Sequence, residues 1–218
     1  MNKPTIKSTR RTSNGAALFK LAAVLVLGMA AGAAMFVATL RSTPESALGA
    51  ANAISVTGLQ GLVDQQSARF DPTVLKGRYA LVYFGFTFCP DACPTALYNL
   101  TLALARLDAD VKRIQPIFVS VDPARDTPAQ LNEYLAHFSQ HIIGLTGSAQ
   151  ATQSVEQNFG VIAVEHRDAS LPGGYTMDHS NEFLLFSPTG KLLMRLPADQ
   201  GVDALFEQLR GLTKAEVV

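Results

Sequence analysis

The stretch Ala80–Pro94 reads ALVYFGFTFCPDACP and holds the only two cysteines of this 218-residue chain, Cys89 and Cys93. Its first seven residues form an apolar run, as expected for a strand that is buried on both faces. The next segment, Pro94–Leu107, repeats leucine at intervals of three, four and three residues, which is typical of a helix. A second apolar run, Pro116–Val121, follows. This order predicts a parallel strand–helix–strand unit with the thiols at its first junction.

The rest of the chain predicts helices and a hairpin that complete a mixed sheet. A capping side chain before a proline, in Asp126-Thr127-Pro128, indicates a helix that runs to about Phe138. Residues 54–75 are expected to add a small strand pair. The later expected elements are a helix over Ala149–Phe159, a hairpin of strands over Glu182–Ser187 and Lys191–Leu196, and a closing helix over Val202–Leu212. The predicted fold class is therefore α/β, a thioredoxin-like mixed sheet flanked by helices.

The formal charge of the chain is zero, but its basic residues are unevenly placed. The first 41 residues contain six basic and no acidic side chains, so the remainder carries 12 basic and 18 acidic residues. A mildly acidic domain without a basic stripe argues against a nucleic-acid partner.

An uncharged run of 20 residues, Leu21–Leu40, follows the basic start of the chain. It has about the length needed to cross a hydrocarbon core of roughly 30 Å, and it lacks the polar face of a buried core helix. A cleaved signal peptide is the main alternative, with Ala51-Asn52-Ala53 as a cleavage pattern, but the apolar part of such signals is usually only about 7–15 residues long. We therefore expect one retained N-terminal transmembrane helix.

This anchor divides the chain into four expected parts. The basic residues 1–20 should stay in the cytoplasm under the positive-inside rule, and residues 21–40 cross the membrane once. Residues 41–53, rich in Ser, Ala and Gly, form a tether, and residues 54–218 form the folded domain. We expect this domain on the periplasmic, non-cytoplasmic side of the cell inner membrane, where thiols can persist as a disulfide.

Pro94 predicts how the thiols are presented. A proline fits the first helical position, which puts Cys93 at or near the N-cap and Cys89 on the preceding loop. The free N–H groups of a helix N-terminus stabilise thiolate, so at least one thiol pKa should fall below the free value of about 8.5. Thiolates attack disulfides and bind soft metals such as Cu(I). A purely structural disulfide is the alternative, although closing so short a loop would add little stability.

Four histidines could add an imidazole ligand, which would suit Cu(II) as well. His137 and His141 have i, i+4 spacing near the expected end of the second helix, where exposed histidines are favourable with the helix dipole. His166 lies in a polar stretch and is expected to be solvated. His179 follows the flexible Pro172-Gly173-Gly174 and comes just before a sheet strand. Its loop could reach the rim where the cysteines lie, so His179 is the best placed of the four.

The segment Asp122–Asp126, which reads DPARD, follows the second apolar strand. A turn and a helix cap explain its composition. Its Arg125 could in addition lie near the thiols and add a positive field there.

Four motifs of the chain occur in the order that is typical of one protein family. They are Phe84–Pro94 (FGFTFCPDACP), Val119–Pro128 (VSVDPARDTP), Gly144–Gly147 (GLTG) and Tyr175–Ser180 (YTMDHS). Together they resemble the Sco/SenC family, whose members are membrane-tethered, thioredoxin-like copper proteins that assist assembly of the CuA site of cytochrome c oxidase. The resemblance covers roughly residues 54–212, and the four motifs in order are more specific than the cysteine motif alone.

The resemblance implies a copper site made of two cysteines and one histidine. The family's ligands match Cys89, Cys93 and His179, with copper bound as Cu(I), Cu(II) or both. The expected partner is the CuA-bearing subunit of cytochrome c oxidase, with another copper carrier or a thiol reductase as further candidates. One departure is Phe88, because family members often carry histidine or another polar residue before the first cysteine. This position is not a ligand, so the departure bears on solvent access or partner contact.

Two function classes remain open. In the first, a metallochaperone holds copper and passes it to an oxidase subunit. In the second, a thiol–disulfide oxidoreductase uses Cys89 and Cys93 as its redox-active pair and reduces the cysteines of a copper-accepting partner. The histidine favours the first class, and so does the CxxxC spacing, which differs from the CxxC of common disulfide exchangers. A peroxidase, by analogy with related thioredoxin-like folds, is a third and weaker alternative, so we expect a carrier rather than an enzyme.

Overall fold

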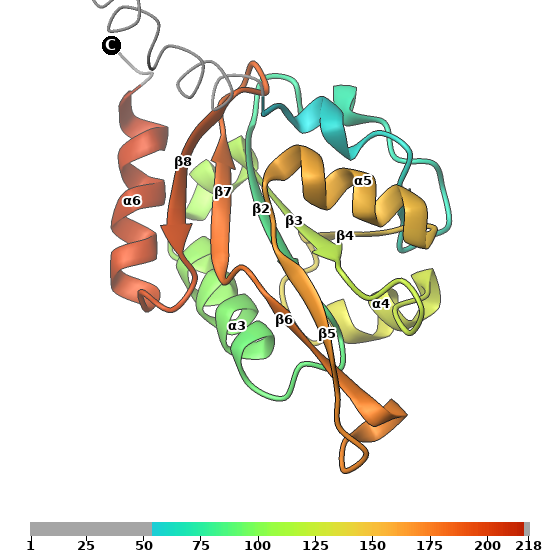
Figure 1. The fold of residues 1–218 in the computed structure, drawn as a ribbon. Coiled ribbons are helices and arrows are strands. Elements are labelled where there is room, and N and C mark those ends of the chain that lie inside the picture. Colours follow the sequence, from blue (N-terminus) through green and yellow to red (C-terminus); the bar gives the residue numbers. More distant parts are fainter. Residues whose placement is uncertain (1–53, 216–218) are drawn as a thin grey trace, which may run out of the picture. The chain divides into compact units, whose positions relative to one another are not determined.

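A parallel strand–helix–strand unit forms the centre of the fold in residues 54–215, the part of the chain that the computed structural model describes. β2 (Tyr79–Gly85) is followed by α3 (Ala92–Ala105) and β3 (Ile114–Ser120), and the two strands pair in parallel (Figure 1). Every residue of both strands is buried, as the apolar runs predicted.

The six-stranded sheet extends from this unit in both directions, in the order β1-β4-β3-β2-β7-β8. β4 (Ile143–Thr146) lies parallel to β3, and β7 (Glu182–Phe186) lies antiparallel to β2. The outer strands are β1 (Val63–Asp64) and β8 (Leu192–Pro197), which are antiparallel to β4 and β7. A parallel crossover unit followed by an antiparallel hairpin and a terminal helix is the thioredoxin-like arrangement, so the predicted mixed α/β sheet is confirmed.

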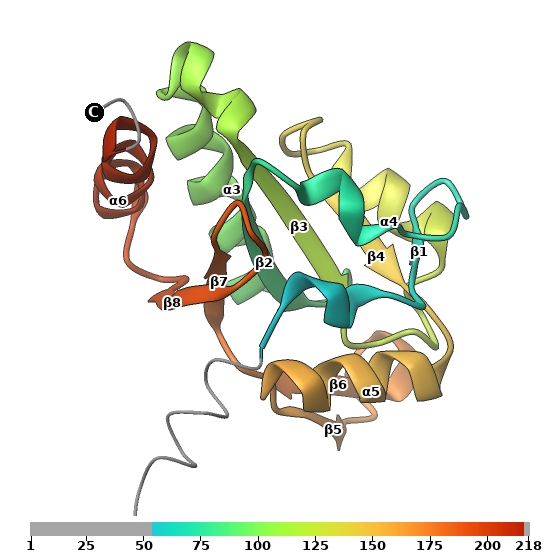
Figure 2. The ribbon, with the colours of Figure 1, turned by 90° about the horizontal axis from the view of Figure 1, so that it is seen from above.

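Helices cover both faces of the sheet. α3 packs against α6 (Val202–Ala215) on one side, and α5 (Ala149–Phe159) lies on the other side (Figure 2). Alternate side chains of β2 reach different layers, as the two-residue repeat of a strand requires. The Phe84 ring lies 5.5 Å from that of Phe159 in α5, whereas the Tyr83 ring lies 6.2 Å from that of Phe118, on the opposite face.

The helix after β3 begins as its sequence signals predicted and ends earlier. α4 (Pro128–Leu135) starts at the expected proline, and the Thr127 side chain accepts a hydrogen bond from the Gln130 N–H group at 3.2 Å. The helix ends three residues before the expected Phe138. The segment that carries two of the candidate histidines therefore lies beyond the helix.

Other regions differ from the prediction as well, and one is β4, a strand that the sequence pattern did not indicate. β5 (Ala163–Arg167) and β6 (Tyr175–His179) form a separate antiparallel pair that the sequence pattern did not indicate. In place of the expected strand pair, residues 54–75 form two 3-10 helices and the two-residue strand β1, whose partner is β4. The 3-10 helices are η1 (Val56–Leu59) and η2 (Pro72–Leu75).

The predicted anchor and tether, residues 21–40 and 41–53, lie outside the described residues. Within residues 54–215, no helix is both long and apolar enough to cross a membrane.

Candidate metal centre

Cys89 lies on the loop between β2 and α3, and Cys93 lies in the first turn of α3. This loop runs beside the β5–β6 hairpin (Figure 1). Asp91 is the N-cap of α3, so Cys93 is the second helical residue and lies near the cap, as the sequence predicted. Pro94 is tolerated in this first turn because its missing N–H group would have no partner within the helix. Cys93 is fully buried and Cys89 is partly exposed, and both are free thiols.

Gly85, the last residue of β2, leaves room for the Cys93 sulfur. A Cβ atom at position 85 would lie 3.0 Å from Cys93 Sγ and 2.9 Å from a ring carbon of Phe118. Both neighbours are buried in a close-packed interior, so neither can move freely. A side chain at this position would crowd the buried thiol and the Phe118 ring, so at least one of them would have to shift.

Asp126 joins the ends of β2 and β3 and thereby holds the loop that carries Cys89. Its buried carboxylate accepts hydrogen bonds from the Thr87 N–H group at 3.1 Å, from the Thr87 hydroxyl at 2.7 Å and from the Ser120 hydroxyl at 2.7 Å. Burial raises the pKa of Asp126, and these hydrogen bonds oppose the rise. The sequence indicated a turn and a helix cap here. The cap is Thr127, and Asp126 instead fixes the loop.

His179 is the last residue of β6, so it lies on a strand and not on the loop that the sequence predicted. Its Nδ1 lies 3.0 Å from the carbonyl oxygen of Ser180. A carbonyl oxygen can only accept a hydrogen bond, so Nδ1 carries a proton, and Nε2 is the ring nitrogen that faces the thiols. Nε2 lies 3.2 Å from Cys93 Sγ. The rings of Tyr83 and Phe86 hold the imidazole edge-on, with centroid distances of 6.0 and 5.9 Å.

The two sulfurs and a ring nitrogen of His179 all lie within 4.8 Å of one another. Donors that bind one first-row metal at about 2.0–2.3 Å are at most about 4.6 Å apart, so small movements would close this set on an ion. Two thiolates and one imidazole are a donor set that fits copper in either oxidation state. Within residues 54–215, no second group of three or more such side chains gathers this closely.

The other three histidines lie away from the thiols. His137 and His141 are exposed and follow the end of α4. His166 lies on β5, half-exposed as expected of a solvated residue, and its Nε2 is 2.8 Å from the Asp178 carboxylate. The structure thus brings His179, alone of the four, to the cysteines.

The two thiols differ in acidity. The pKa of Cys89 is lowered most by the hydrogen bond from the Cys93 thiol. Hydrogen bonds from His179 and from two backbone N–H groups lower it further. Partial burial opposes these effects, and the resulting pKa of Cys89 is about 4. One of these N–H groups, that of Cys93, lies 3.3 Å from Cys89 Sγ. The hydrogen bond to Cys89, burial and the Cys89 charge together raise the pKa of Cys93. The predicted thiolate is therefore the loop cysteine.

The side chains that hold the imidazole were not predicted from the sequence. Tyr83 and Phe86 enclose the His179 ring, and the Tyr83 hydroxyl donates a 2.9 Å hydrogen bond to Asn181 Oδ1, two residues after the imidazole. In the sequence, both aromatic residues are members of an apolar run like any buried strand. No signal in the run distinguishes them from ordinary core residues.

An open hollow of about 300 Å³ gives access to the partly exposed thiol. The cysteine loop and β6 line it, and its walls include Cys89, Pro90, Met177 and His179. A molecule that approaches the site from solvent therefore meets Cys89 and the imidazole before the buried Cys93.

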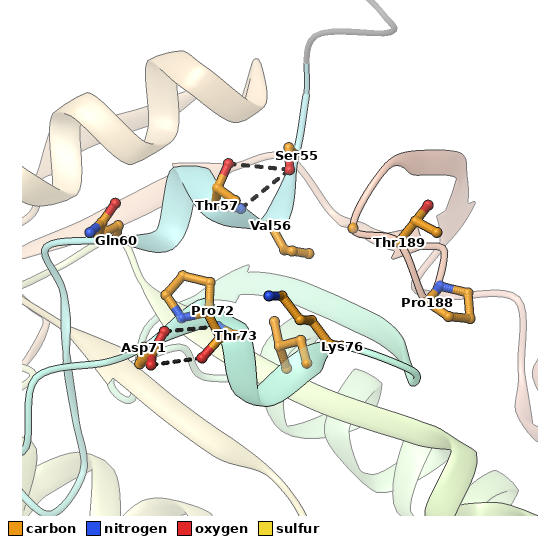
Figure 3. Close-up of a pocket in the computed structure, with 12 residues that line it drawn as sticks. Ser55, Val56, Thr57, Gln60, Asp71, Pro72, Thr73, Lys76, Pro188 and Thr189 are labelled. Atoms are coloured by element: carbon orange, nitrogen blue, oxygen red, sulfur yellow. Dashed lines mark hydrogen bonds between the residues drawn. The ribbon is translucent and has the colours of Figure 1, made fainter.

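A second hollow, of about 180 Å³, lies at the opposite end of β2 (Figure 3). It is lined by η1, η2 and the turn Pro188–Gly190. The Gly77 N–H group, just before β2, donates a 3.1 Å hydrogen bond to the Pro188 carbonyl oxygen in this turn. Its polar walls include Asp71 and Lys76 but no thiol or imidazole. This hollow is separate from the candidate metal centre.

Comparison with known proteins identifies the family. A family model described as SCO1/SenC matches residues 51–214. The chain belongs to the SCO1/SenC family. A SCO2-like protein of Rickettsia conorii, for example, is 36% identical over 199 residues, which are 89% of this chain and 97% of the relative.

Solved SCO1/SenC structures share the fold and include copper-bound forms. The structure of Bradyrhizobium japonicum ScoI with copper bound matches with a TM-score of 0.64 and 32% identity, over 70% of this chain and 96% of that chain. Yeast Sco1 with copper bound matches with a TM-score of 0.60 and 35% identity, over 72% and 90% of the two chains. The predicted family is therefore confirmed.

Proposed function

We propose that this SCO1/SenC protein is a membrane-anchored copper metallochaperone that assists assembly of the CuA site of cytochrome c oxidase. The carrying observation is that the Cys89 and Cys93 sulfurs and a His179 nitrogen converge within 4.8 Å. Copper is the cargo of this site, and the copper-bound relatives support that choice of metal. The CuA-bearing subunit of the oxidase is the proposed acceptor.

The site can both hold and release such a cargo. Cys93 and His179 are fixed by their surroundings, whereas Cys89 is partly exposed beside the open hollow. An acceptor thiolate that enters the hollow would form its bond to copper as the Cys89 bond breaks. Cys93 and His179 would then be exchanged in turn. This transfer is a ligand exchange, so the copper keeps its oxidation state and no electron donor is needed.

Reduction of a partner disulfide is the second candidate function, and the lowered pKa of Cys89 favours it. Cys89 would attack the partner's disulfide, and Cys93 would resolve the mixed disulfide. Two electrons would pass from the pair, which becomes a disulfide, to the partner, which gains two thiols. Cys93 must lose its proton in the second step, and its burial disfavours that loss. The balance therefore favours the metallochaperone.

The proposed location is the inner membrane, with the domain on the periplasmic side. The uncharged run Leu21–Leu40 and the basic residues before it support this orientation.

Replacing His179 by Ala tests the two candidate functions against each other. Loss of one metal ligand should weaken copper binding by the full-length protein at least about 100-fold. This factor corresponds to about 2.8 kcal/mol of binding free energy, because each tenfold change in affinity is about 1.4 kcal/mol. A chaperone would lose support of oxidase assembly together with the metal. A reductase would keep most of its exchange activity, because the Cys93 hydrogen bond is the largest cause of the Cys89 thiolate.

The measurements are copper affinity by competition with a chelator and oxidase assembly in cells grown at low copper. His166→Ala is the matched control, because this histidine is half-exposed and pairs with Asp178 instead of the thiols. Intact oxidase assembly by a His179→Ala protein that no longer holds copper would refute the chaperone and leave the reductase.

A further inference from the structure

Arg125 lies between the loop that carries Cys89 and the hairpin that carries His179. Its guanidinium carbon is 3.6 Å from the centroid of the Tyr175 ring, at the start of β6, and 4.8 Å from that of Phe88, the residue before Cys89. The Arg125 side chain is only 12% exposed. Cation–π contacts strengthen when they are withdrawn from water in this way.

Asp122 closes these contacts into a ring. Its buried carboxylate pairs with Arg125 Nε and accepts a 2.8 Å hydrogen bond from the Tyr175 hydroxyl. Arg125 Nη1 also donates to the Tyr175 carbonyl oxygen at 3.0 Å. The turn that follows β3 therefore contacts the ring, the hydroxyl and the backbone carbonyl of Tyr175. The three residues Asp122, Arg125 and Tyr175 are called the Arg125 clamp below.

The hairpin of β5 and β6 needs such an attachment. The two strands form a sheet of their own, outside the hydrogen-bonded ladders of the six-stranded sheet, and β5 is mostly exposed. An isolated two-stranded hairpin is only marginally stable in water. At the His179 end, the hydrogen bond between Tyr83 and Asn181 ties the chain to β2. At the other end of β6, the tie is the Arg125 clamp.

We propose that Arg125 and Tyr175 are positioning residues for the copper ligand His179. The clamp fixes the start of β6, and the pairing of Tyr83 with Asn181 fixes its end, so the imidazole faces the two sulfurs before copper arrives. The inference rests on the proposed copper site. Residues that orient metal ligands without touching the metal typically change affinity about 10–100-fold when they are replaced.

Tyr175→Phe tests the clamp without any change of charge, because it keeps the ring and removes only the hydroxyl that bonds to Asp122. We expect the copper affinity of the reduced, full-length protein to fall about 10-fold. In the copper-free protein, amide hydrogen exchange of residues 175–179 should become faster. The double change Asp122→Asn with Arg125→Met removes the contacts of the Arg125 guanidinium without leaving a buried unpaired charge, and it should bring the loss toward about 100-fold.

A double-mutant cycle separates positioning from a general effect on the thiols. In a His179→Ala protein there is no imidazole to position, so Tyr175→Phe should then change copper affinity by less than about 3-fold. Arg106→Met is the matched control. Arg106 stacks on Phe206 at 4.0 Å and pairs with Asp203, between α3 and α6, so its loss should leave affinity and hairpin exchange unchanged.

Equal losses of affinity with and without His179 would overturn the inference, because the clamp would then act on the thiols. Unchanged affinity and unchanged exchange in both clamp variants would overturn it as well. Copper binding that survives His179→Ala undiminished would instead contradict the proposed function, and the exchange rates would still report whether the clamp holds the hairpin.

Discussion

At Cys89, burial and hydrogen bonding act in opposite directions. Burial alone would raise the pKa of the thiol, but the Cys93 thiol, His179 and two backbone N–H groups lower it to about 4. At neutral pH the residue is then a thiolate, the form that binds copper and attacks disulfides. The same arrangement keeps the proton on Cys93.

This difference predicts a selective and nearly pH-independent alkylation of the reduced, copper-free protein. Between about pH 6 and about pH 8, the rate at which iodoacetamide modifies Cys89 should stay nearly constant. For a thiol with a pKa of about 8.5, the rate would fall about tenfold for each unit by which the pH is lowered. Cys93, which is fully buried, should stay unmodified while the protein is folded. Peptide mass spectrometry of timed samples measures both rates. A Cys89 rate that rises tenfold per pH unit over this range would disprove the lowered pKa.

The three side chains of the candidate metal centre could be singled out from the sequence because their motifs are local. Cys89 and Cys93 stand four residues apart at a strand–helix junction, and His179 belongs to a second short motif. The contacts that orient them join distant residues. Tyr83 and Asn181 are 98 residues apart, and Tyr175 and Asp122 are 53 apart. No pattern of spacing along a chain encodes such pairs.

Among the elements, the strands that read as apolar runs, β2 and β3, were predictable, and those of the β5–β6 pair were not. β2 and β3 are buried along their whole length, and a strand covered on both faces must be apolar throughout. In β5, by contrast, four of five residues are exposed, so no alternation of apolar and polar side chains marks it. The β5–β6 hairpin is held together by the pairing of its two strands and is attached to the domain by the Arg125 clamp. Both sets of contacts join residues that are distant in the sequence.

In α5, burial of Glu156 predicts a pH-dependent stability. The ordinary pKa of this carboxyl is 4.5, and burial raises it to about 7 in the folded protein. The folded form thus keeps a proton that the unfolded form loses above about pH 4.5, so stability should fall as the pH rises from about 5 to about 7. Because Glu156 is only partly buried and solvent screens its charge, we expect a change of about 1 kcal/mol, or about 2–4 °C in Tm.

Glu156→Gln removes this titration and should flatten the dependence of Tm on pH over the same interval. Glu133→Gln in α4 is the control, because Glu133 is an exposed glutamate on a neighbouring helix. Its Tm profile should follow that of the unchanged protein. Equal slopes for Glu156→Gln and the unchanged protein would show that another group causes the pH dependence.

At the scale of the whole domain, the site occupies one end of the parallel strands. The cysteine loop leaves the carboxyl end of β2, and the turn that carries Asp122 and Arg125 leaves the carboxyl end of β3. The two strands run side by side, so their following loops necessarily meet at one edge of the sheet. The crossover unit read from the sequence therefore fixes the neighbourhood of the site, and the β5–β6 hairpin then brings the third donor.

The proposed membrane topology can be tested with the chain's own thiols. Both cysteines belong to the domain, and Cys89 is the partly exposed one, so a maleimide that cannot cross membranes should report where the domain lies. In spheroplasts treated with an impermeant reductant, we expect labelling of Cys89 before lysis and recovery of the label in the membrane fraction. Cys89→Ser should abolish the label, because Cys93 is buried.

Labelling only after lysis would place the domain in the cytoplasm. Labelled protein released by osmotic shock, with a mature N-terminus near Ile54, would show that the uncharged run is a cleaved signal and not an anchor.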